Sequence, residues 1–127
     1  MRLFLVRHAE AASGDPDELR SLTPGGREAA RALGEKLAAQ RPEAVLSSPL
    51  LRARETAEQI ARAAGVHAEP DDRLAPGATS QDVRAAVAGR GETVVAVGHQ
   101  PDCSTIVFEL TGRQIKFAPA AVFVVHL

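Results

Sequence analysis

The sequence has one cysteine, no tryptophan and no tyrosine, and it lacks any long apolar run. The lone Cys103 cannot form an internal disulfide, and nothing else in the chain indicates an oxidising compartment. The apolar start of the chain stops at Arg7 and His8, far short of a signal-peptide core or a membrane span. We therefore expect a cytoplasmic protein that has no contact with a membrane.

The chain also lacks a strong charge of either sign. Its formal net charge is -1, from 15 basic and 16 acidic side chains, so no general attraction to nucleic acid is expected and any basic site must be local. Apolar residues make up 45% of the 127 residues and charged residues 24%, which are ordinary values for a globular domain. The sequence predicts a single domain that spans residues 1–127.

Short apolar runs alternate in this domain with stretches of helical period. The runs are 3–6, 44–46, 93–97 and 121–125. They lack the strict alternation of a half-exposed strand, which is typical of strands covered by helices on both faces. The pattern predicts an α/β fold, a three-layer sandwich whose central sheet is mostly parallel and flanked by helices.

Proline and glycine mark the expected helix ends. Three prolines stand where helices are expected to start, at Pro24, Pro49 and Pro101. Ser48 is expected to cap the second of these helices. Gly65 and Gly112 stand where two helices should end. The segment 9–21 has no periodicity and is expected to be a surface loop.

Three of the expected strands end in residues that can bind an anion. The first runs into Arg7 and His8, the second into Ser47 with Arg52 one turn into the following helix, and the third into His99. The carboxyl ends of parallel strands meet at one edge of a sheet. We therefore expect two arginines and two histidines to converge there on a pocket for a tetrahedral dianion.

Phosphoryl transfer needs these residue types. Arginine offers paired donors that match two phosphate oxygens and stays protonated near neutral pH. A neutral imidazole can attack phosphorus and form a phosphohistidine, which water then cleaves. The arginine charges should disfavour the imidazolium and so keep the attacking nitrogen free. A second histidine can hold another phosphate oxygen.

These residues lie in segments that resemble the successive motifs of the histidine phosphatase superfamily, which is phosphoglycerate-mutase-like. The segments are 5–10, 22–26, 47–57 and 97–99. The resemblance implies the phosphoglycerate-mutase-like fold, with His8 as the nucleophile, Arg7 and Arg52 as phosphate clamps and His99 as the second phosphate-binding histidine. The short chain and the run 98–101 look most like the SixA-type branch, whose members remove phosphate from phosphohistidine on signalling proteins.

The sequence departs from the family pattern at two places. Ala9 stands where the superfamily usually has glycine, a substitution that matters only if the backbone needs a positive φ. Larger members that cleave phosphate esters carry an acidic proton donor shortly after a leucine in mid-chain. If Leu74 is that leucine, Ala75 and Pro76 stand where the acid would fall.

The missing acid favours a good leaving group. An alkoxide leaves poorly unless it is protonated, whereas imidazole has a conjugate-acid pKa of roughly 6.5 and its bond to phosphorus breaks readily once the nitrogen is protonated. Phosphohistidine or another activated phosphate is therefore the expected substrate. The carboxylates that remain as substitutes, with no motif behind them, are Glu10, Asp71 and Asp72.

Other side chains are assigned to the site less directly. Ser13 and Ser47 are candidate phosphate ligands, although loop chemistry explains Ser13 equally well and Ser47 could simply satisfy a strand end. Thr56 is expected to pack against the site or orient it and not to take part in catalysis directly. Arg20 is expected to be a solvated surface charge. The four histidines and the cysteine have no metal-ligand spacing, so we predict neither a metal nor a cofactor.

The leading hypothesis is a cofactor-independent phosphatase that acts through phospho-His8 on phosphohistidine borne by a protein. The first alternative is a phosphatase for small-molecule phosphate esters. The second belongs to another class, a non-catalytic module that binds phosphate or phosphohistidine. The expected partner is therefore a phosphorylated protein or a small phosphate substrate, and not a nucleic acid.

Overall fold

The computed structural model describes residues 1–127 and contains one five-stranded sheet. Its strands are β1 (Arg2–Arg7), β2 (Ala44–Ser47), β3 (Ala68–Pro70), β4 (Thr93–Gly98) and β5 (Val122–His126). They lie in the order β3-β2-β4-β1-β5, and β5 alone is antiparallel to its neighbour. The prediction of a mostly parallel sheet is confirmed.

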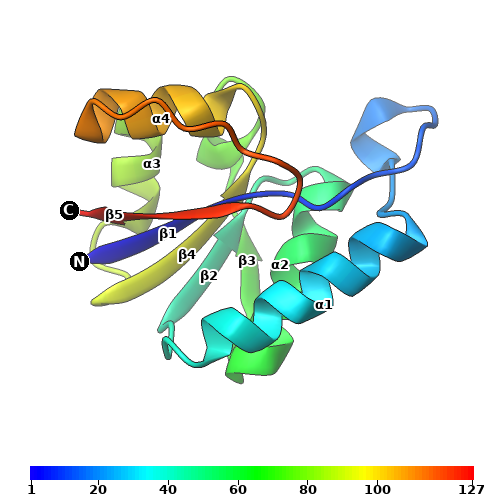
Figure 1. Ribbon diagram of the computed structural model, residues 1–127, viewed down its shortest axis with the longest axis horizontal. Coiled ribbons are helices and arrows are strands. Elements are labelled where there is room, and N and C mark those ends of the chain that lie inside the picture. The colour runs from blue at the N-terminus through cyan, green and yellow to red at the C-terminus, as the bar shows by residue number, and fades with distance from the viewer.

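Helices cover both faces of this sheet. They are α1 (Pro24–Ala38), α2 (Leu51–Ala64), α3 (Ser80–Val87) and α4 (Asp102–Thr111), with short 3₁₀ turns η1 (Asp17–Leu19) and η2 (Asp72–Leu74). Figure 1 shows α1 and α2 on one face and α3 and α4 on the other. Successive side chains of β1 point to opposite faces of the sheet. Leu3 and Leu5 pack with α3 and α4, whereas Phe4 and Val6 pack with α1 and α2. The predicted three-layer α/β sandwich is confirmed.

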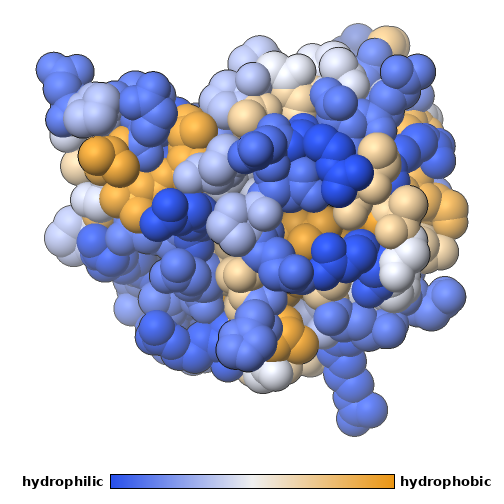
Figure 2. Space-filling model, turned by 180° about the vertical axis from the view of Figure 1, so that it is seen from behind, coloured by the Kyte–Doolittle hydropathy of each residue, from blue (hydrophilic) through white to orange (hydrophobic).

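The outer surface is mainly polar. Figure 2 shows hydrophilic residues over most of one face, with smaller apolar areas between them. The large hydrophobic side chains that remain exposed are Leu19, Phe108 and Val122. No helix has the length and apolar character needed to cross a membrane.

The helix ends follow some of the sequence signals. Pro24 is the first residue of α1 as predicted, but Pro49 lies two residues before the start of α2, and Pro101 takes the cap position of α4 instead of its first helical position. Gly65 and Gly112 end α2 and α4 with φ of 75° and 77°, the left-handed conformation that glycine adopts without strain. The expectation that Ser48 caps α2 is wrong, because the helix begins at Leu51 and Leu50 takes the cap position without a side-chain hydrogen bond. The Ser48 hydroxyl is therefore available for another contact.

Strand pairing brings the predicted site residues together. Arg7 pairs with Gly98 at the ends of β1 and β4, and the backbone N–H of His8 donates to the carbonyl of Gly98 at 3.0 Å. On the other side of β4, the N–H of Ser48 donates to the carbonyl of Val97 at 2.9 Å. The residues that follow β1, β2 and β4 thus lie side by side at one edge of the sheet.

Candidate active site

Two histidines form the centre of this edge. The ring centroids of His8 and His99 are 5.2 Å apart, and the rings meet edge to face at 62°. His99 is buried, with 5% of its surface exposed, whereas His8 keeps partial contact with solvent. Solvent or a substrate can therefore reach His8, while His99 lies below it as part of the wall.

The protonation state of His8 follows from its partner. Its Nδ1 lies 2.7 Å from the carbonyl oxygen of Ala9, which can only accept, so Nδ1 carries the proton and the neutral ring leaves Nε2 with a free electron pair. Burial is the largest cause that lowers the pKa of His8, and the charges of Arg52 and Arg7 lower it further. The arginine charges thus act on His8 in the predicted direction, and burial, which the prediction did not include, is the larger cause because it penalises the imidazolium.

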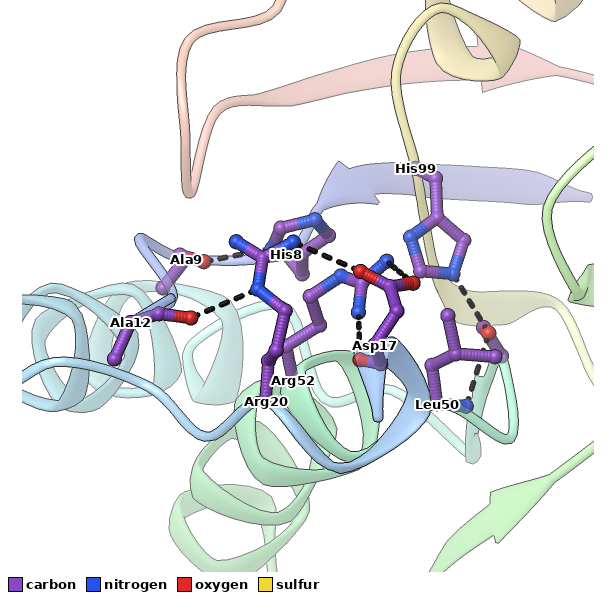
Figure 3. Close-up of polar contacts among 9 residues, drawn as sticks. His8, Ala9, Ala12, Asp17, Arg20, Leu50, Arg52 and His99 are labelled. Carbon is purple, nitrogen blue, oxygen red and sulfur yellow. Dashed lines mark hydrogen bonds and ion pairs between the residues drawn. The ribbon is translucent and has the colours of Figure 1, made fainter. Parts of the chain in front are cut away.

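His99 is held even more firmly in its neutral form. Burial, followed by the charges of His8 and Arg52, lowers the pKa of His99 to about 4. Its Nε2 lies 2.7 Å from the hydroxyl oxygen of Ser48, a buried contact. Figure 3 shows the other ring nitrogen of His99 turned toward Asp17 and His8.

Arg7 and Arg52 are held by different partners. Arg52, in the first turn of α2, is buried, and its guanidinium donates to the backbone carbonyl of Asp17 at 2.8 Å and to its carboxylate at 3.1 Å. Arg7 donates through Nη1 to the carbonyl of Phe117 at 2.8 Å, whereas its buried Nε has no partner. Buried donors are almost always satisfied in folded proteins, so the unpaired Nε of Arg7 is a donor that an anion could use.

Sequence reasoning missed Asp17 and Arg20. Both lie in the segment 9–21, which the backbone N–H of Leu22 ties to the Glu55 carboxylate at 2.8 Å. Arg20 is not a freely solvated charge as expected, because its Nε donates to the carbonyl of Ala12 at 2.8 Å and its Nη1 to Asp17 at 3.0 Å. The segment has no hydrophobic period, so its sequence alone held no signal that these side chains reach the site.

The two serines assigned to phosphate binding lie in different environments. Ser47 is buried, and its hydroxyl donates to the carbonyl of Ser48 at 2.9 Å. Ser13 is exposed in the loop that follows β1, and it makes none of the polar contacts that hold His8, Arg52 and His99. The structure thus brings Arg7, His8, Arg52 and His99 together, whereas Ser47 is buried with its hydroxyl donated to the backbone and Ser13 shares none of their polar contacts.

Thr56 links the residue after His8 to α2. Its hydroxyl accepts the backbone N–H of Ala9 at 3.0 Å and donates to the carbonyl of Arg52 at 2.9 Å. The backbone of Ala9 does not adopt a positive φ, so the family's glycine is not needed there. Thr56 therefore holds the loop after β1 against the turn of α2 that carries Arg52.

Two of the three carboxylates considered as proton donors are engaged elsewhere. Glu10 accepts from the Thr23 hydroxyl at 2.8 Å, and Asp71 holds Arg73 at 2.8 Å. Beyond Ala75 and Pro76, the N–H of Gly77 donates to the carboxylate of Asp102 at 2.8 Å.

Cys103 is buried in the core, where burial raises the pKa of its thiol to about 12. The structure gathers no three metal-ligating side chains of the kind that could hold an ion.

Comparisons with known proteins show which family and which solved structures this chain is similar to. Residues 3–76 match the model of the histidine phosphatase superfamily (branch 1). An uncharacterized protein of Picosynechococcus is 34% identical over 96% of this chain and 82% of its own length. The solved structure of the protein histidine phosphatase SixA with tungstate superposes with a TM-score of 0.88 at 30% identity, over all of this chain and 88% of the other. SixA from Agrobacterium tumefaciens gives 0.82 at 28% identity, covering 97% and 89%.

Proposed function

Because this chain belongs to the histidine phosphatase superfamily and is a phosphatase of that superfamily, we propose that it hydrolyses phosphohistidine on a protein through a phospho-His8 intermediate, without a cofactor. One observation carries the proposal: the unprotonated Nε2 of His8 lies in a site shared with His99, where Arg7 and Arg52 both act on the imidazole. The proposed nucleophile and the guanidinium groups that would bind the phosphate therefore belong to the same site.

In the first step, Nε2 of His8 attacks phosphorus in line with the leaving nitrogen. The new N–P bond forms as the bond from phosphorus to the substrate imidazole breaks, and the leaving nitrogen keeps the electron pair and takes up a proton. The equatorial oxygens carry the negative charge. The free Nε of Arg7 and the guanidinium of Arg52 offer charged donors for them.

In the second step, water attacks the phosphorus of phospho-His8. The N–P bond breaks, its electron pair returns to Nε2, and inorganic phosphate leaves. Throughout, the carbonyl of Ala9 keeps the proton on Nδ1, so that Nε2 is again ready to attack. This carbonyl also stabilises the positive charge that the ring acquires while it holds the phosphoryl group.

The chain's own departure from the larger members supports phosphohistidine as the substrate. Ala75 and Pro76 supply no acid where those members carry one, and a substrate imidazole needs less help than an alkoxide because its conjugate-acid pKa is roughly 6.5. Two solved structures that are similar to this chain carry the SixA name, and one of them is described as a protein histidine phosphatase. His8 also keeps partial exposure, as a side chain still attached to a protein requires.

The test compares turnover of a phosphohistidine phosphocarrier protein with turnover of sugar phosphates, nucleotides and phosphoserine. We expect kcat/KM to favour phosphohistidine by roughly 10²-fold or more, the contribution of the general acid that unactivated esters need. Equal or better rates on alkyl esters would reject this substrate class in favour of a small-molecule phosphatase. Binding of phosphohistidine with neither phosphate release nor a labelled enzyme in an alkaline-quenched sample would instead favour a non-catalytic module.

A further inference from the structure

Asp17 places a carboxylate between two arginines at the rim of the site. Its Oδ2 lies 3.1 Å from Nη2 of Arg52, and its Oδ1 lies 3.0 Å from Nη1 of Arg20. Figure 3 shows the carboxylate between the two guanidinium groups, beside His99 and close to His8. An anion supplied by the chain itself therefore bridges two cations at the place where we propose that the substrate binds a phosphate.

The charges around this carboxylate act on both histidines. Asp17 opposes the lowering of the His99 pKa, and Arg20 contributes to the lowering of the His8 pKa. Such effects fall off with distance, so the bridged carboxylate and Arg20 both lie within electrostatic reach of the proposed reacting atoms. The bridge is part of the site rather than a distant surface contact.

The partners in the bridge differ in how firmly they are held. The Arg52 side chain is only 9% exposed, whereas that of Asp17 is 58% exposed. Arg20 has a second anchor, because its Nε donates to the carbonyl of Ala12 at 2.8 Å in addition to the contact of its Nη1 with Asp17. The carboxylate can thus swing into solvent while both guanidinium groups stay in place, and exposed ion pairs are weak enough to be displaced.

We propose that Asp17 is an internal ligand of the anion site that substrate phosphate displaces, and that Arg20 then becomes a third guanidinium for the bound phosphate. The inference rests on the proposed function. A phosphate carries more negative charge than a carboxylate and has three oxygens free for donors, so it competes well for two forked guanidinium groups. Asp17 keeps these groups neutralised and oriented between turnovers, at the expense of phosphate affinity.

Binding of inorganic phosphate and of orthovanadate, measured by calorimetry, tests the displacement. Asp17→Asn keeps the size of the side chain but removes the competing charge, so we expect the Kd of either anion to fall roughly twofold to fivefold, within the range that loss of one exposed ion pair allows. The matched control is Glu18→Gln, which removes a charge from the next, exposed residue of η1. An unchanged or higher Kd for Asp17→Asn, relative to that control, would overturn the displacement.

Arg20→Gln tests the second half of the proposal. In the Asp17→Asn background, where no carboxylate competes, we expect it to raise the Kd of phosphate by roughly tenfold or more, as loss of a charged hydrogen bond does. Arg31→Gln removes another ion-paired arginine, on the exposed side of α1, and serves as its control. Equal Kd values for these two variants in that background would show that Arg20 does not bind the anion. Thermal unfolding of each variant checks that the fold is intact.

A crystal structure determined after soaking with tungstate tests the displacement of Asp17 independently of the binding measurements. We expect the anion within hydrogen-bond distance of Nη1 of Arg20 and the Asp17 carboxylate turned away from Arg52. Tungstate bound beside His8 with the bridge still closed would contradict the displacement while leaving the proposed function intact. If the wild-type protein binds no phosphate and forms no phospho-His8, the proposed function fails, and this inference fails with it.

Discussion

The hydroxyl oxygen of Ser48 lies 2.7 Å from Nε2 of His99, which joins the residue after β2 to the residue after β4. The same oxygen accepts the backbone N–H of Leu50 at 3.2 Å, and since the hydroxyl contacts no acceptor other than Nε2, we infer that it donates its proton to Nε2. Nδ1 of the neutral His99 ring then carries the ring proton, on the side that faces Asp17 and His8 (Figure 3). Ser48 thus turns His99 into a neutral hydrogen-bond donor toward the site.

Ser48→Ala should therefore disturb His99 without removing it. The variant leaves the buried Nε2 and the N–H of Leu50 without their partner, so we expect a loss of about 1–3 kcal/mol in unfolding free energy and a higher Kd for phosphate. Nitrogen NMR of the imidazole should show the Nδ1–H tautomer of His99 lost or mixed. Ser47→Ala is the control, because its hydroxyl donates only to a backbone carbonyl. An unchanged His99 spectrum in Ser48→Ala would contradict the assigned tautomer.

His8→Ala should separate phosphate binding from turnover. The arginines and His99 remain, so the fold and a measurable phosphate affinity should persist, whereas loss of the nucleophile should lower kcat by roughly 10³-fold or more. The labelled phosphoenzyme should disappear from alkaline-denatured samples. His67→Ala removes an exposed histidine at the start of the short edge strand and should change neither quantity. A His8→Ala protein with full activity would refute the assigned nucleophile.

The core of the site could be predicted because it depends on local signals. Apolar runs located β1, β2 and β4, and parallel pairing then required Arg7, His8 and His99 to share one edge, as the register confirms. Arg52 could be placed as well, since it stands one turn into the helix that follows β2. Neither prediction required any knowledge of how the loops run.

The outer part of the site depends on contacts between distant residues and could not be predicted in this way. Asp17 and Arg20 reach the site because Glu55, on α2, holds the end of their loop through Leu22. Ser48 was interpreted as a helix cap, but the start of α2 at Leu51 leaves its hydroxyl to a histidine 51 residues away. Sequence periodicity carries no information on such pairings, which emerge only after the sheet and α2 have packed.

The lowered histidine pKa values predict a loss of stability in mild acid. The folded-state pKa values of His8 and His99 both lie below the ordinary 6.5, that of His99 at about 4. Below pH 6.5 the unfolded chain therefore binds protons that the folded chain does not. Stability should therefore fall as pH decreases from about 6.5 to 4, by at most about 1.4 kcal/mol per pH unit for each histidine. Asp17, Asp71 and Asp82 have pKa values lowered from 3.8, so their stabilisation is lost only at more acidic pH.

Urea unfolding at pH 7 and at pH 4.5 measures this slope. We expect His99→Gln to make stability less dependent on pH across the window, because its amide has no proton to gain, whereas His126→Gln, at the exposed end of β5, should keep the wild-type slope. Activity should also persist to lower pH than a nucleophilic histidine with an ordinary pKa would allow, because burial lowers the pKa of His8. An identical slope in wild type and His99→Gln would contradict the lowered pKa.

Two adjacent glycines at the start of α1 provide a matched pair for testing how this helix supports the loop after His8. A Cβ at Gly26 would lie 2.1 Å from the carbonyl oxygen of Glu10, whereas a Cβ at Gly25 meets nothing closer than the Thr23 hydroxyl at 3.9 Å. Gly26→Ala must therefore push backbone against backbone and should cost about 1–3 kcal/mol of unfolding free energy. Gly25→Ala should be neutral or stabilise the helix by up to about 1 kcal/mol.

The same pair also predicts an effect on catalysis. Glu10 lies two residues after the proposed nucleophile, and its carbonyl accepts the N–H of Thr23 at 3.0 Å, so displacing it should shift the Ala9 carbonyl that sets the proton on His8. Gly26→Ala should consequently lower kcat for phosphohistidine at temperatures where the variant is still folded, and Gly25→Ala should retain the wild-type value. Equal kcat in the two variants would mean that the approach of α1 to Glu10 supports stability alone and does not position His8.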